Sequence, residues 1–145
     1  MQKKMNTNSR KVAAAVAENK VVLGLSGGVD STAAALLLKE KGFEVTGLYF
    51  DVTTEADEKS EKSRAAAEKA AKEMDIDFVY KNVSREFNET VLADFCDEYL
   101  SGRTPNPCII CNPHIKFKTL KETADANGAR YISTGHYASV VFRED

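Results

Sequence analysis

The stretch KVVLGLSGGVDSTAAALLLKEKG, residues 20–42, decides the fold of this 145-residue chain. Its first part, Lys20–Leu25, is a short apolar, β-branched run, which predicts a buried strand. A turn with two glycines follows over Ser26–Asp30. The Ala/Leu-rich residues 31–41 then predict a helix that ends at Gly42. A buried strand that enters a helix through a glycine turn is typical of α/β folds.

The same alternation continues along the chain. Further strands are expected at Glu44–Phe50, Phe78–Tyr80 and Arg130–Thr134, with Tyr137–Phe142 as the start of a fifth. Further helices are expected at Lys59–Met74, Glu86–Leu100 and Ile115–Ala126. This order predicts a doubly wound parallel sheet with helices on both faces. Ligands bind such sheets outside the carboxyl ends of the strands, so the loops Ser26–Asp30, Asp51 onward and Gly135–Tyr137 should share one edge.

The composition is that of a single globular domain, with 43% hydrophobic and 29% charged residues. No apolar run approaches the ~20 residues needed to span a bilayer, and the N-terminus lacks the apolar core of a secretory signal. We therefore expect a cytoplasmic protein with no membrane partner. An Ala-rich run at Val12–Ala17 predicts a short helix in an N-terminal extension over residues 1–19. The formal net charge of −2 means that any RNA binding depends on local patches.

The glycine turn has the features of a phosphate cradle. Its two glycines allow close approach of the backbone to an oxyanion, and the following helix presents free N–H groups at its N-terminus. The loop lacks the lysine of a Walker motif and contains Asp30 instead, which suits Mg²⁺ recruitment. The alternative is a plain Gly-Gly turn in which Asp30 and Ser31 cap the helix.

A second unusual segment is SGRTPNPCIICNPHIKF, residues 101–117. All three prolines of the chain fall within residues 102–113, which predicts a stiff, extended loop. Cys111 is then expected near the N-terminus of the next helix, where the helix dipole lowers a thiol pKa. Arg103, Lys116 and Lys118 add local positive charge. Cys108 and Cys111 also have the spacing of half a zinc site, which would need ligands from elsewhere.

These motifs resemble known families. The segment Ser26-Gly-Gly-Val-Asp-Ser31 resembles the hallmark of the PP-loop ATP pyrophosphatases, which cleave ATP between the α- and β-phosphates and adenylate a carbonyl oxygen. Together with residues 101–117 and Thr134-Gly-His-Tyr-Ala138, it makes the chain from about Lys20 to Ala138 similar to the tRNA-specific 2-thiouridylases. Those enzymes convert the wobble uridine of certain tRNAs to 2-thiouridine.

The resemblance implies an adenine nucleotide alpha hydrolase-like fold, the substrate ATP with Mg²⁺, and two partners. These partners are tRNA and a sulfur donor, either a cysteine desulfurase or a sulfur relay protein. ATP would adenylate O2 of the uridine and release pyrophosphate, after which sulfur would attack C2 and expel AMP. A lone histidine after a strand is commonly structural, but the position of His136 in the third motif favours contact with tRNA.

The resemblance also assigns roles to individual residues. The implied nucleotide-binding residues are Gly24, Leu25, Ser26, Gly27, Gly28, Val29, Asp30, Ser31, Phe50 and Gly135, with Asp30 as the candidate Mg²⁺ ligand. The implied tRNA contacts are Asn106, Pro107, Cys108 and His136. The candidate catalytic cysteines are Cys111, which matches the family's nucleophile, and Cys108.

The chain departs from the family pattern in two ways. Many members carry an aspartate where this chain has Cys108, and a second cysteine beside Cys111 favours a thiolase with a 4Fe–4S cluster held by three cysteines. The persulfide route remains open. The family's other catalytic cysteine and its tRNA-gripping domains lie beyond residue 145. We therefore expect residues 20–145 to be a PP-loop ATP-binding domain that stops before the tRNA-binding and C-terminal domains.

Three other functions remain open. Another PP-loop adenylating synthetase would share the phosphate loop but has no reason to contain the two cysteines. A nonenzymatic ATP-binding module would bind ATP without forming AMP. A structural zinc protein would retain zinc and bind no ATP.

Overall fold

The computed structural model describes residues 18–54 and 58–143, so the helix predicted at Val12–Ala17 lies outside the described residues. The described part contains one parallel sheet with the strand order β3-β2-β1-β4. Its strands are β1 (Lys20–Gly24), β2 (Glu44–Asp51), β3 (Asp77–Asn82) and β4 (Tyr131–Ser133). All four predicted positions are thus confirmed. The chain moves outward from β1 to β3 and then returns to add β4 on the other side of β1, so strand order reverses between β1 and β4.

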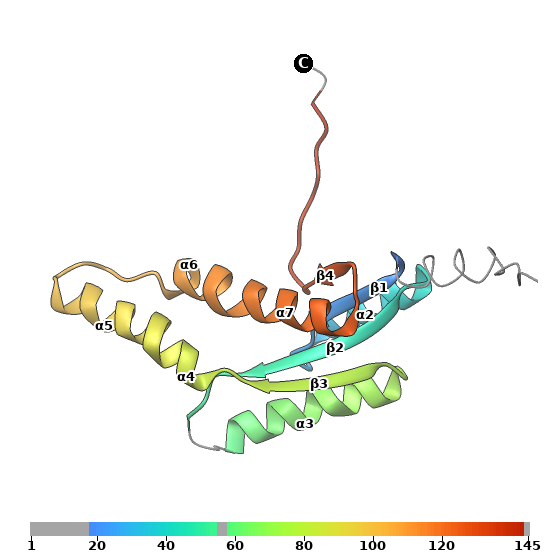
Figure 1. The fold of residues 1–145 in the computed structure, drawn as a ribbon, viewed down its shortest axis with the longest axis horizontal. Helices are drawn as coiled ribbons and strands as arrows, with labels where there is room; N and C mark the ends of the chain where they lie inside the picture. Colours follow the sequence, from blue (N-terminus) through green and yellow to red (C-terminus); the bar gives the residue numbers. More distant parts are fainter. Residues whose placement is uncertain (1–17, 55–57, 144–145) are drawn as a thin grey trace, which may run out of the picture.

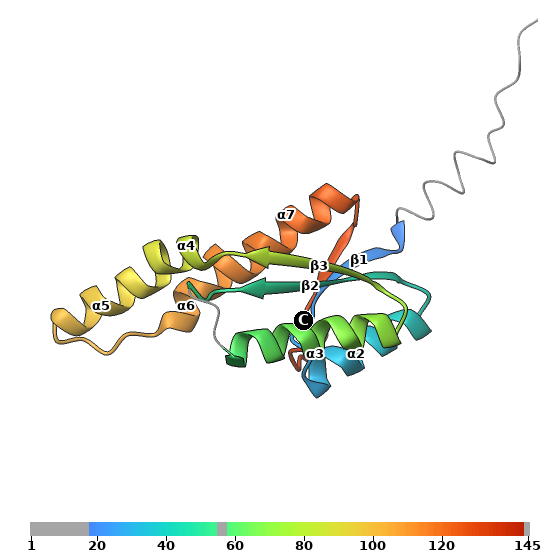
Figure 2. The same cartoon turned by 90° about the horizontal axis from the view of Figure 1, so that it is seen from below.

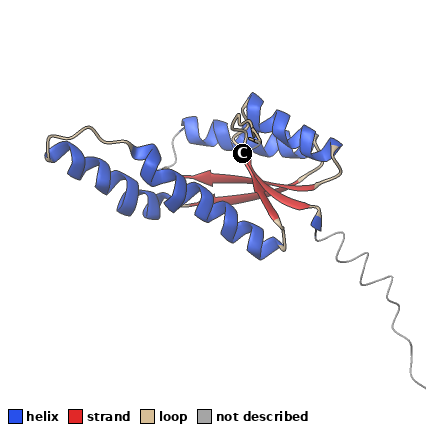
Figure 3. Ribbon diagram, turned by 90° about the horizontal axis from the view of Figure 1, so that it is seen from above, coloured by secondary structure: helices blue, strands red, loops and turns tan. Residues whose placement is uncertain are grey.

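Helices cover both faces of this sheet, as predicted. Figure 1 shows α7 (Lys118–Asn127) above the strands and α3 (Glu58–Glu73) below them, and Figure 2 shows α2 (Val29–Glu40) beside α3. Figure 3 shows the strands between these helical layers. Successive residues of a strand face opposite sides of the sheet. Accordingly, Val21 and Leu23 pack toward α2, whereas Val22 packs against α7.

A helical arm extends beyond the carboxyl ends of β2 and β3 (Figure 1). Its outgoing half consists of α4 (Ser84–Phe87), the π-helical turn η1 (Asn88–Leu92) and α5 (Ala93–Leu100). Its returning half consists of α6 (Pro107–Cys111), the π-helical turn η2 (Asn112–Phe117) and α7. The buried side chains of Val83, Val91 and Ile115 hold the two halves together.

Two predictions about the C-terminal half are wrong. The loop predicted over residues 102–113 ends early, because Pro107 begins α6. Proline fits the first turn of a helix, where its missing N–H leaves no hydrogen bond unmade. No strand forms among residues 137–142 in the described chain. Tyr137, Val140, Val141 and Phe142 are exposed there, so this apolar segment has no neighbouring strand with which to pair.

The loop after β2 is fixed by the carboxylate of Asp51. Its Oδ1 accepts hydrogen bonds from the backbone N–H and the hydroxyl of Thr53, at 2.9 and 2.6 Å. Its Oδ2 accepts from Ser60 at 3.0 Å and from Tyr80 at 3.2 Å. One side chain therefore joins β2 to β3 and to the first turn of α3. Burial opposes ionisation of this carboxyl, but the hydrogen bonds outweigh burial and hold the pKa of Asp51 below its ordinary value.

We expect Asp51→Asn to lower the free energy of unfolding by about 1–3 kcal/mol at neutral pH, because hydrogen bonds to a charged acceptor are lost. A folded-state pKa below the unfolded value of about 3.9 gives stability that is complete above that value and is lost as the pH falls through the folded pKa. The difference between wild type and variant should therefore shrink below about pH 4. Urea unfolding of both proteins across this range measures it. A difference independent of pH would contradict the role of the charge.

Candidate functional site

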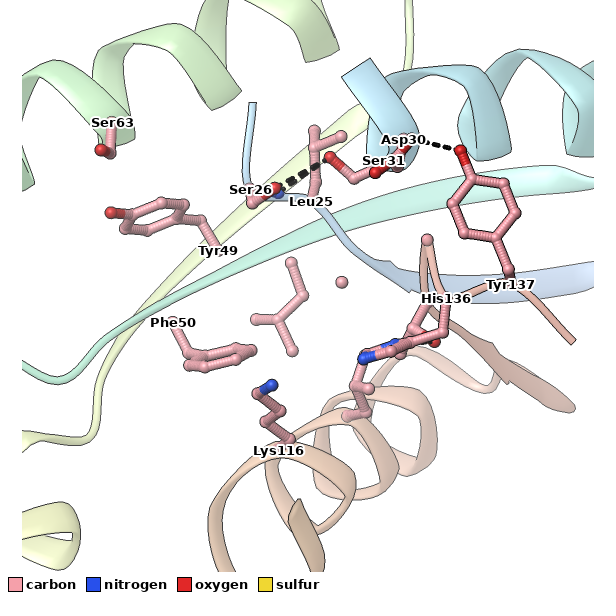
Figure 4. Close-up of a pocket in the computed structure, with 15 residues that line it drawn as sticks. Leu25, Ser26, Asp30, Ser31, Tyr49, Phe50, Ser63, Lys116, His136 and Tyr137 are labelled. Atoms are coloured by element: carbon pink, nitrogen blue, oxygen red, sulfur yellow. Dashed lines mark hydrogen bonds between the residues drawn. The ribbon is translucent and has the colours of Figure 1, made fainter. Parts of the chain in front are cut away.

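A cavity of about 600 Å³ opens at the carboxyl edge of the sheet, where strand order reverses. Its lining comes from the loop after β1, the start of α2, the end of β2, one residue of α3, the returning half of the arm and the loop after β4. The lining residues are Gly24, Leu25, Ser26, Asp30, Ser31, Leu48, Tyr49, Phe50, Ser63, Lys116, Leu120, Thr134, Gly135, His136 and Tyr137. Figure 4 shows how the labelled members surround this space. The loops after β1 and β4 thus share one edge, as predicted.

The turn after β1 leaves the start of α2 open. Gly28 is the N-cap residue, and no side chain caps the helix. Ser31 is buried and its hydroxyl donates to the Gly28 carbonyl at 3.1 Å, while the Ser26 N–H donates to the Ser31 hydroxyl at 3.2 Å. The interpretation of Asp30 and Ser31 as helix caps is therefore wrong. The open N-terminus of α2 carries a partial positive charge at the cavity, which favours an anion.

Two glycines make this arrangement possible. Gly27 has a φ of +76°, and a Cβ added to it would lie 2.7 Å from the Ala67 backbone nitrogen in α3. A Cβ added to Gly135 would lie 2.8 Å from the Ser31 backbone nitrogen. Any side chain at either position would collide with backbone. The glycines therefore let the phosphate loop pack against α3 and let the loop after β4 cross the start of α2.

The loop after β4 is tied to the phosphate loop by one hydrogen bond. The Tyr137 hydroxyl donates to Asp30 Oδ1 at 2.7 Å (Figure 4). This bond and the negative charge of Asp30 raise the pKa of Tyr137 above its ordinary value. His136 lies beside it, with Nδ1 at 2.9 Å from the Thr134 hydroxyl oxygen. Asp30 and His136, both selected from sequence, thus lie at one cavity.

Most of the residues selected for nucleotide binding line this cavity. Those that line it are Gly24, Leu25, Ser26, Asp30, Ser31, Phe50 and Gly135. Gly27, Gly28 and Val29 lie in the turn and in the first residue of α2 but do not line the cavity. Sequence reasoning assigned no cavity role to Tyr49, Ser63, Lys116, Thr134 or Tyr137. Tyr49 could have been found from its position beside Phe50 at the end of β2. Consecutive side chains of a strand face opposite sides of the sheet, and a ligand at the edge of the sheet can contact both sides.

The two cysteines selected as catalytic lie on α6, and neither lines the cavity. Cys108 is exposed, whereas Cys111 is half-buried and packs in the same apolar cluster as Phe50 and Ile115. Phe50 belongs to both this cluster and the cavity wall, so the cluster that contains Cys111 adjoins the cavity. Asn106 and Pro107 begin this helix, with Asn106 exposed as the N-cap.

Burial raises the pKa of Cys111, with Lys116 acting in the opposite direction and Cys108 adding to the rise. The lowering expected from a helix N-terminus is therefore wrong. The reason is position: Cys111 is the last residue of α6, in the middle of a continuous helical half of the arm, and not at a helix start. An apolar surrounding disfavours the thiolate.

A complete metal site is not assembled within residues 18–54 and 58–143. No group of three or more His, Cys, Asp or Glu side chains among them could hold a metal ion. Cys108 and Cys111 supply two thiols, and Cys96 is exposed on α5. A cluster held by three cysteines would thus need a further ligand.

Comparison with known proteins decides the family. The model of the tRNA methyl transferase HUP domain matches residues 19–145. The chain belongs to this HUP domain family. It is 47% identical over 122 residues to tRNA-specific 2-thiouridylase MnmA 2 of Clostridium botulinum (strain Loch Maree / Type A3), which covers 83% of the chain and 35% of that protein. It is 42% identical over 135 residues to MnmA of Clostridium perfringens (strain 13 / Type A), which covers 88% and 38%.

The resemblance to the tRNA-specific 2-thiouridylases is thereby confirmed, and this HUP domain spans little more than a third of the length of these relatives. Among solved structures, it resembles the U34-tRNA thiolase NcsA from Methanococcus maripaludis with its [4Fe-4S] cluster. That match has a TM-score of 0.59 and 28% identity, and covers 88% of this chain and 43% of NcsA. NMN synthetase from Francisella tularensis shares the fold, with a TM-score of 0.54 and 18% identity over 85% of this chain and 51% of that one.

No helix among the described residues of the HUP domain is both long enough and apolar enough to cross a membrane.

We expect Cys111 to be the slowest of the three thiols to react with N-ethylmaleimide at neutral pH, because burial both shields it and raises its pKa. Its labelling rate should also keep rising to a higher pH than is usual for a thiol, because a thiol with a raised pKa ionises later. Peptide mass spectrometry after timed quenching measures the three rates. Labelling in guanidinium, where all three should react alike, is the control, and equal rates in the folded chain would contradict the prediction.

Proposed function

We propose that this chain is the ATP-binding, adenylating domain of a tRNA-uridine 2-sulfurtransferase that forms 2-thiouridine. One observation carries the proposal: the open start of α2 lies at a cavity whose wall includes Phe50, and Phe50 packs in the same apolar cluster as Cys111. A helix end that can bind phosphate and a cysteine in the adjoining apolar cluster suit an enzyme that activates a carbonyl with ATP and then delivers sulfur. The similarity to MnmA, a tRNA-specific 2-thiouridylase, and to NcsA, a U34-tRNA thiolase, supports the same reaction.

In the first step, O2 of the uridine attacks the α-phosphorus of ATP, and pyrophosphate leaves. The backbone N–H groups at the start of α2 are placed to hold the phosphates, since a helix N-terminus binds anions without an added cation. Ser26 and Ser31 fix the turn that presents them, through the hydrogen bonds between them. Gly135 leaves room for the loop after β4 to approach the nucleotide closely.

In the second step, the outer sulfur of a persulfide attacks C2 of the uridine and AMP leaves. A thiolate then attacks the inner sulfur, so that the S–S bond breaks and 2-thiouridine and a disulfide are left. Cys111 is the proposed nucleophilic cysteine, and Asn106, Pro107, Cys108 and His136 are the proposed tRNA contacts. The first three lie together at the start of α6, and His136 lies at the cavity mouth. In this arrangement the arm would approach the tRNA from one side and the loop after β4 from the other.

Mg²⁺ fits the proposed reaction, because Asp30 places an exposed carboxylate on the cavity wall beside the phosphate loop. When bound, the ion would neutralise charge that develops on the departing phosphates. The Tyr137 hydroxyl now donates to this carboxylate. We propose that Asp30 holds the ion.

A 4Fe–4S cluster fits the described residues less well. Cys108 and Cys111 are two soft ligands of the right kind, but no third ligand among the described residues, Cys96 included, is grouped with them. NcsA from Methanococcus maripaludis contains such a cluster, and this chain would hold one only if a third ligand came close to Cys108 and Cys111. No step above depends on a cluster, and sulfur that arrives as a persulfide needs none.

The remaining proposals concern the whole enzyme. Residues 20–145 would form the PP-loop domain and residues 1–19 a helical extension. The tRNA-binding and C-terminal domains would be supplied by sequence outside this chain. Its partners would be tRNA and a cysteine desulfurase or sulfur relay protein, which places the enzyme in the cytoplasm.

The proposal predicts that this chain with ATP, Mg²⁺ and unthiolated tRNA releases pyrophosphate faster than it does without tRNA. Asp30→Asn should slow the release about 10- to 100-fold, the range typical for damage to a metal site. Asp125→Asn is the matched control, because Asp125 lies on α7 in an exposed ion pair with Lys121. A coupled pyrophosphate assay and ATP titration of each variant provide the measurements.

The outcomes separate the rival functions. ATP binding without AMP formation, with tRNA present, would indicate a nonenzymatic binding module. Pyrophosphate release that tRNA does not stimulate would favour another adenylating synthetase. Absence of ATP binding, with zinc retained after chelation, would favour a structural zinc protein and would refute the proposal.

A further inference from the structure

The cavity contains one cationic side chain in an unusual position. The phosphate loop has no lysine, and the charged side chains on the cavity wall are Asp30 and Lys116, His136 being counted neutral. ATP and pyrophosphate carry several negative charges, which Asp30 alone would repel. Lys116 comes from the returning half of the arm, across the cavity from the loop (Figure 4). Among the described residues that line the cavity, Lys116 is therefore the one whose positive charge can offset the negative charge of the nucleotide.

Lys116 also differs from its neighbours in its ion pairs. Lys118 lies 4.0 Å from Glu122, and Lys121 lies 2.7 Å from Asp125, both in exposed pairs on α7. Among the described residues, no carboxylate forms an ion pair with Lys116. Lys116 is also partly buried, whereas Lys118 and Lys121 are exposed. A partly buried ammonium without a carboxylate partner has a strong tendency to bind an anion.

A π-helical turn directs Lys116 to this wall. The turn η2 (Asn112–Phe117) interrupts the helix between α6 and α7. Its cause is in the sequence: Pro113 cannot donate a hydrogen bond to the carbonyl of Ile109, and its ring would collide with that carbonyl in an α-helix. Widening the turn removes this conflict, and such turns occur frequently at functional sites.

The wider turn changes which residues share a face. In an α-helix, residues five apart differ by about 140° around the axis. In a π-turn, hydrogen bonds join residues five apart, so Cys111 and Lys116 come to nearly the same side. Lys116 is electrostatically coupled to Cys111 and lines the cavity together with Leu120, one α-helical turn later. The turn thus lets one helix place its thiol behind the cavity wall and its ammonium in the cavity.

We propose that Lys116 binds the phosphates of the nucleotide from the wall opposite the phosphate loop, and that the π-turn at Pro113 positions it there. This inference rests on the proposed function, because it takes ATP as the occupant of the cavity. Lys116 then supplies the positive charge that a Walker loop obtains from its own lysine. It does so from the element that carries Cys111, and therefore couples nucleotide binding to the arm.

Calorimetric titration with ATP·Mg²⁺ and with inorganic pyrophosphate tests this inference. Lys116→Gln should weaken both affinities about 10- to 100-fold, as expected for loss of a charge-assisted hydrogen bond. Lys116→Arg should restore most of the affinity, which a merely structural role of the lysine would not predict. Lys118→Gln is the matched control, two residues away in an exposed ion pair, and should bind as wild type does. Thermal unfolding of each variant checks that it is folded.

Pro113→Ala tests the turn separately. It removes the conflict that widens the helix, so ATP affinity should fall several-fold although Lys116 is still present. If wild type binds both ligands and Lys116→Gln binds them equally well, the inference is overturned and the proposed function stands. If only Pro113→Ala leaves the affinity unchanged, the role of the turn is overturned. If wild type binds pyrophosphate but not ATP, the proposed function fails. The role of Lys116 is then tested by comparing the pyrophosphate affinities of wild type and Lys116→Gln. If wild type binds neither ligand, both fall.

Discussion

The site depends on the uncapped start of α2, held between two close backbone approaches. Gly27 lies against α3 and Gly135 lies against Ser31, each so closely that a Cβ would collide with backbone nitrogen. Because no side chain caps Gly28, the helix end keeps its capacity to bind an anion. This is possible only where β1 and β4 run parallel side by side, since their carboxyl ends then deliver both loops to one point. The parallel pairing of β1 and β4 thus sets the position of the site, and Gly27 and Gly135 allow the backbone to pack closely around it.

The helical arm supplies the wall of the cavity opposite the start of α2, and it carries both Lys116 and Cys111. Cys111 and Lys116 lie on nearly the same side of one helical segment, which residues five apart in a regular α-helix could not do. The π-turn allows this, and the facing π-turn of the outgoing half matches it, with Val91 packed in the same cluster as Ile115. Phe50 closes that cluster from β2 and faces the cavity as well. The apolar cluster therefore fixes the distance between the nucleotide side and the cysteine side.

The sheet and the glycine turn after β1 could be predicted because their signals are local. A β-branched run followed by Gly-Gly and an Ala/Leu-rich helix permits few structures, and parallel strands then place the loops at one edge. The start of α6 was missed because prolines are read as helix breakers, although Pro107 fits a first turn and Pro113 fits a widened one. The pKa direction at Cys111 followed from that error. The side of the helix on which Lys116 lies is set by the π-turn. Residue spacing alone does not reveal that turn, so the sequence did not show that Lys116 lines the cavity.

The two halves of the proposed reaction differ in how much of their machinery the described residues contain. For adenylation, one cavity combines an open helix end, a carboxylate and an ammonium. For sulfur transfer, there are two thiols on one helix, and burial keeps that of Cys111 in its protonated form to higher pH than usual. A buried neutral thiol is a poor nucleophile until a positive charge or a bound ligand changes its surroundings. The positive charge of Lys116 already opposes the effect of burial on Cys111, so under the proposed function one ammonium would act on both the nucleotide and the thiol.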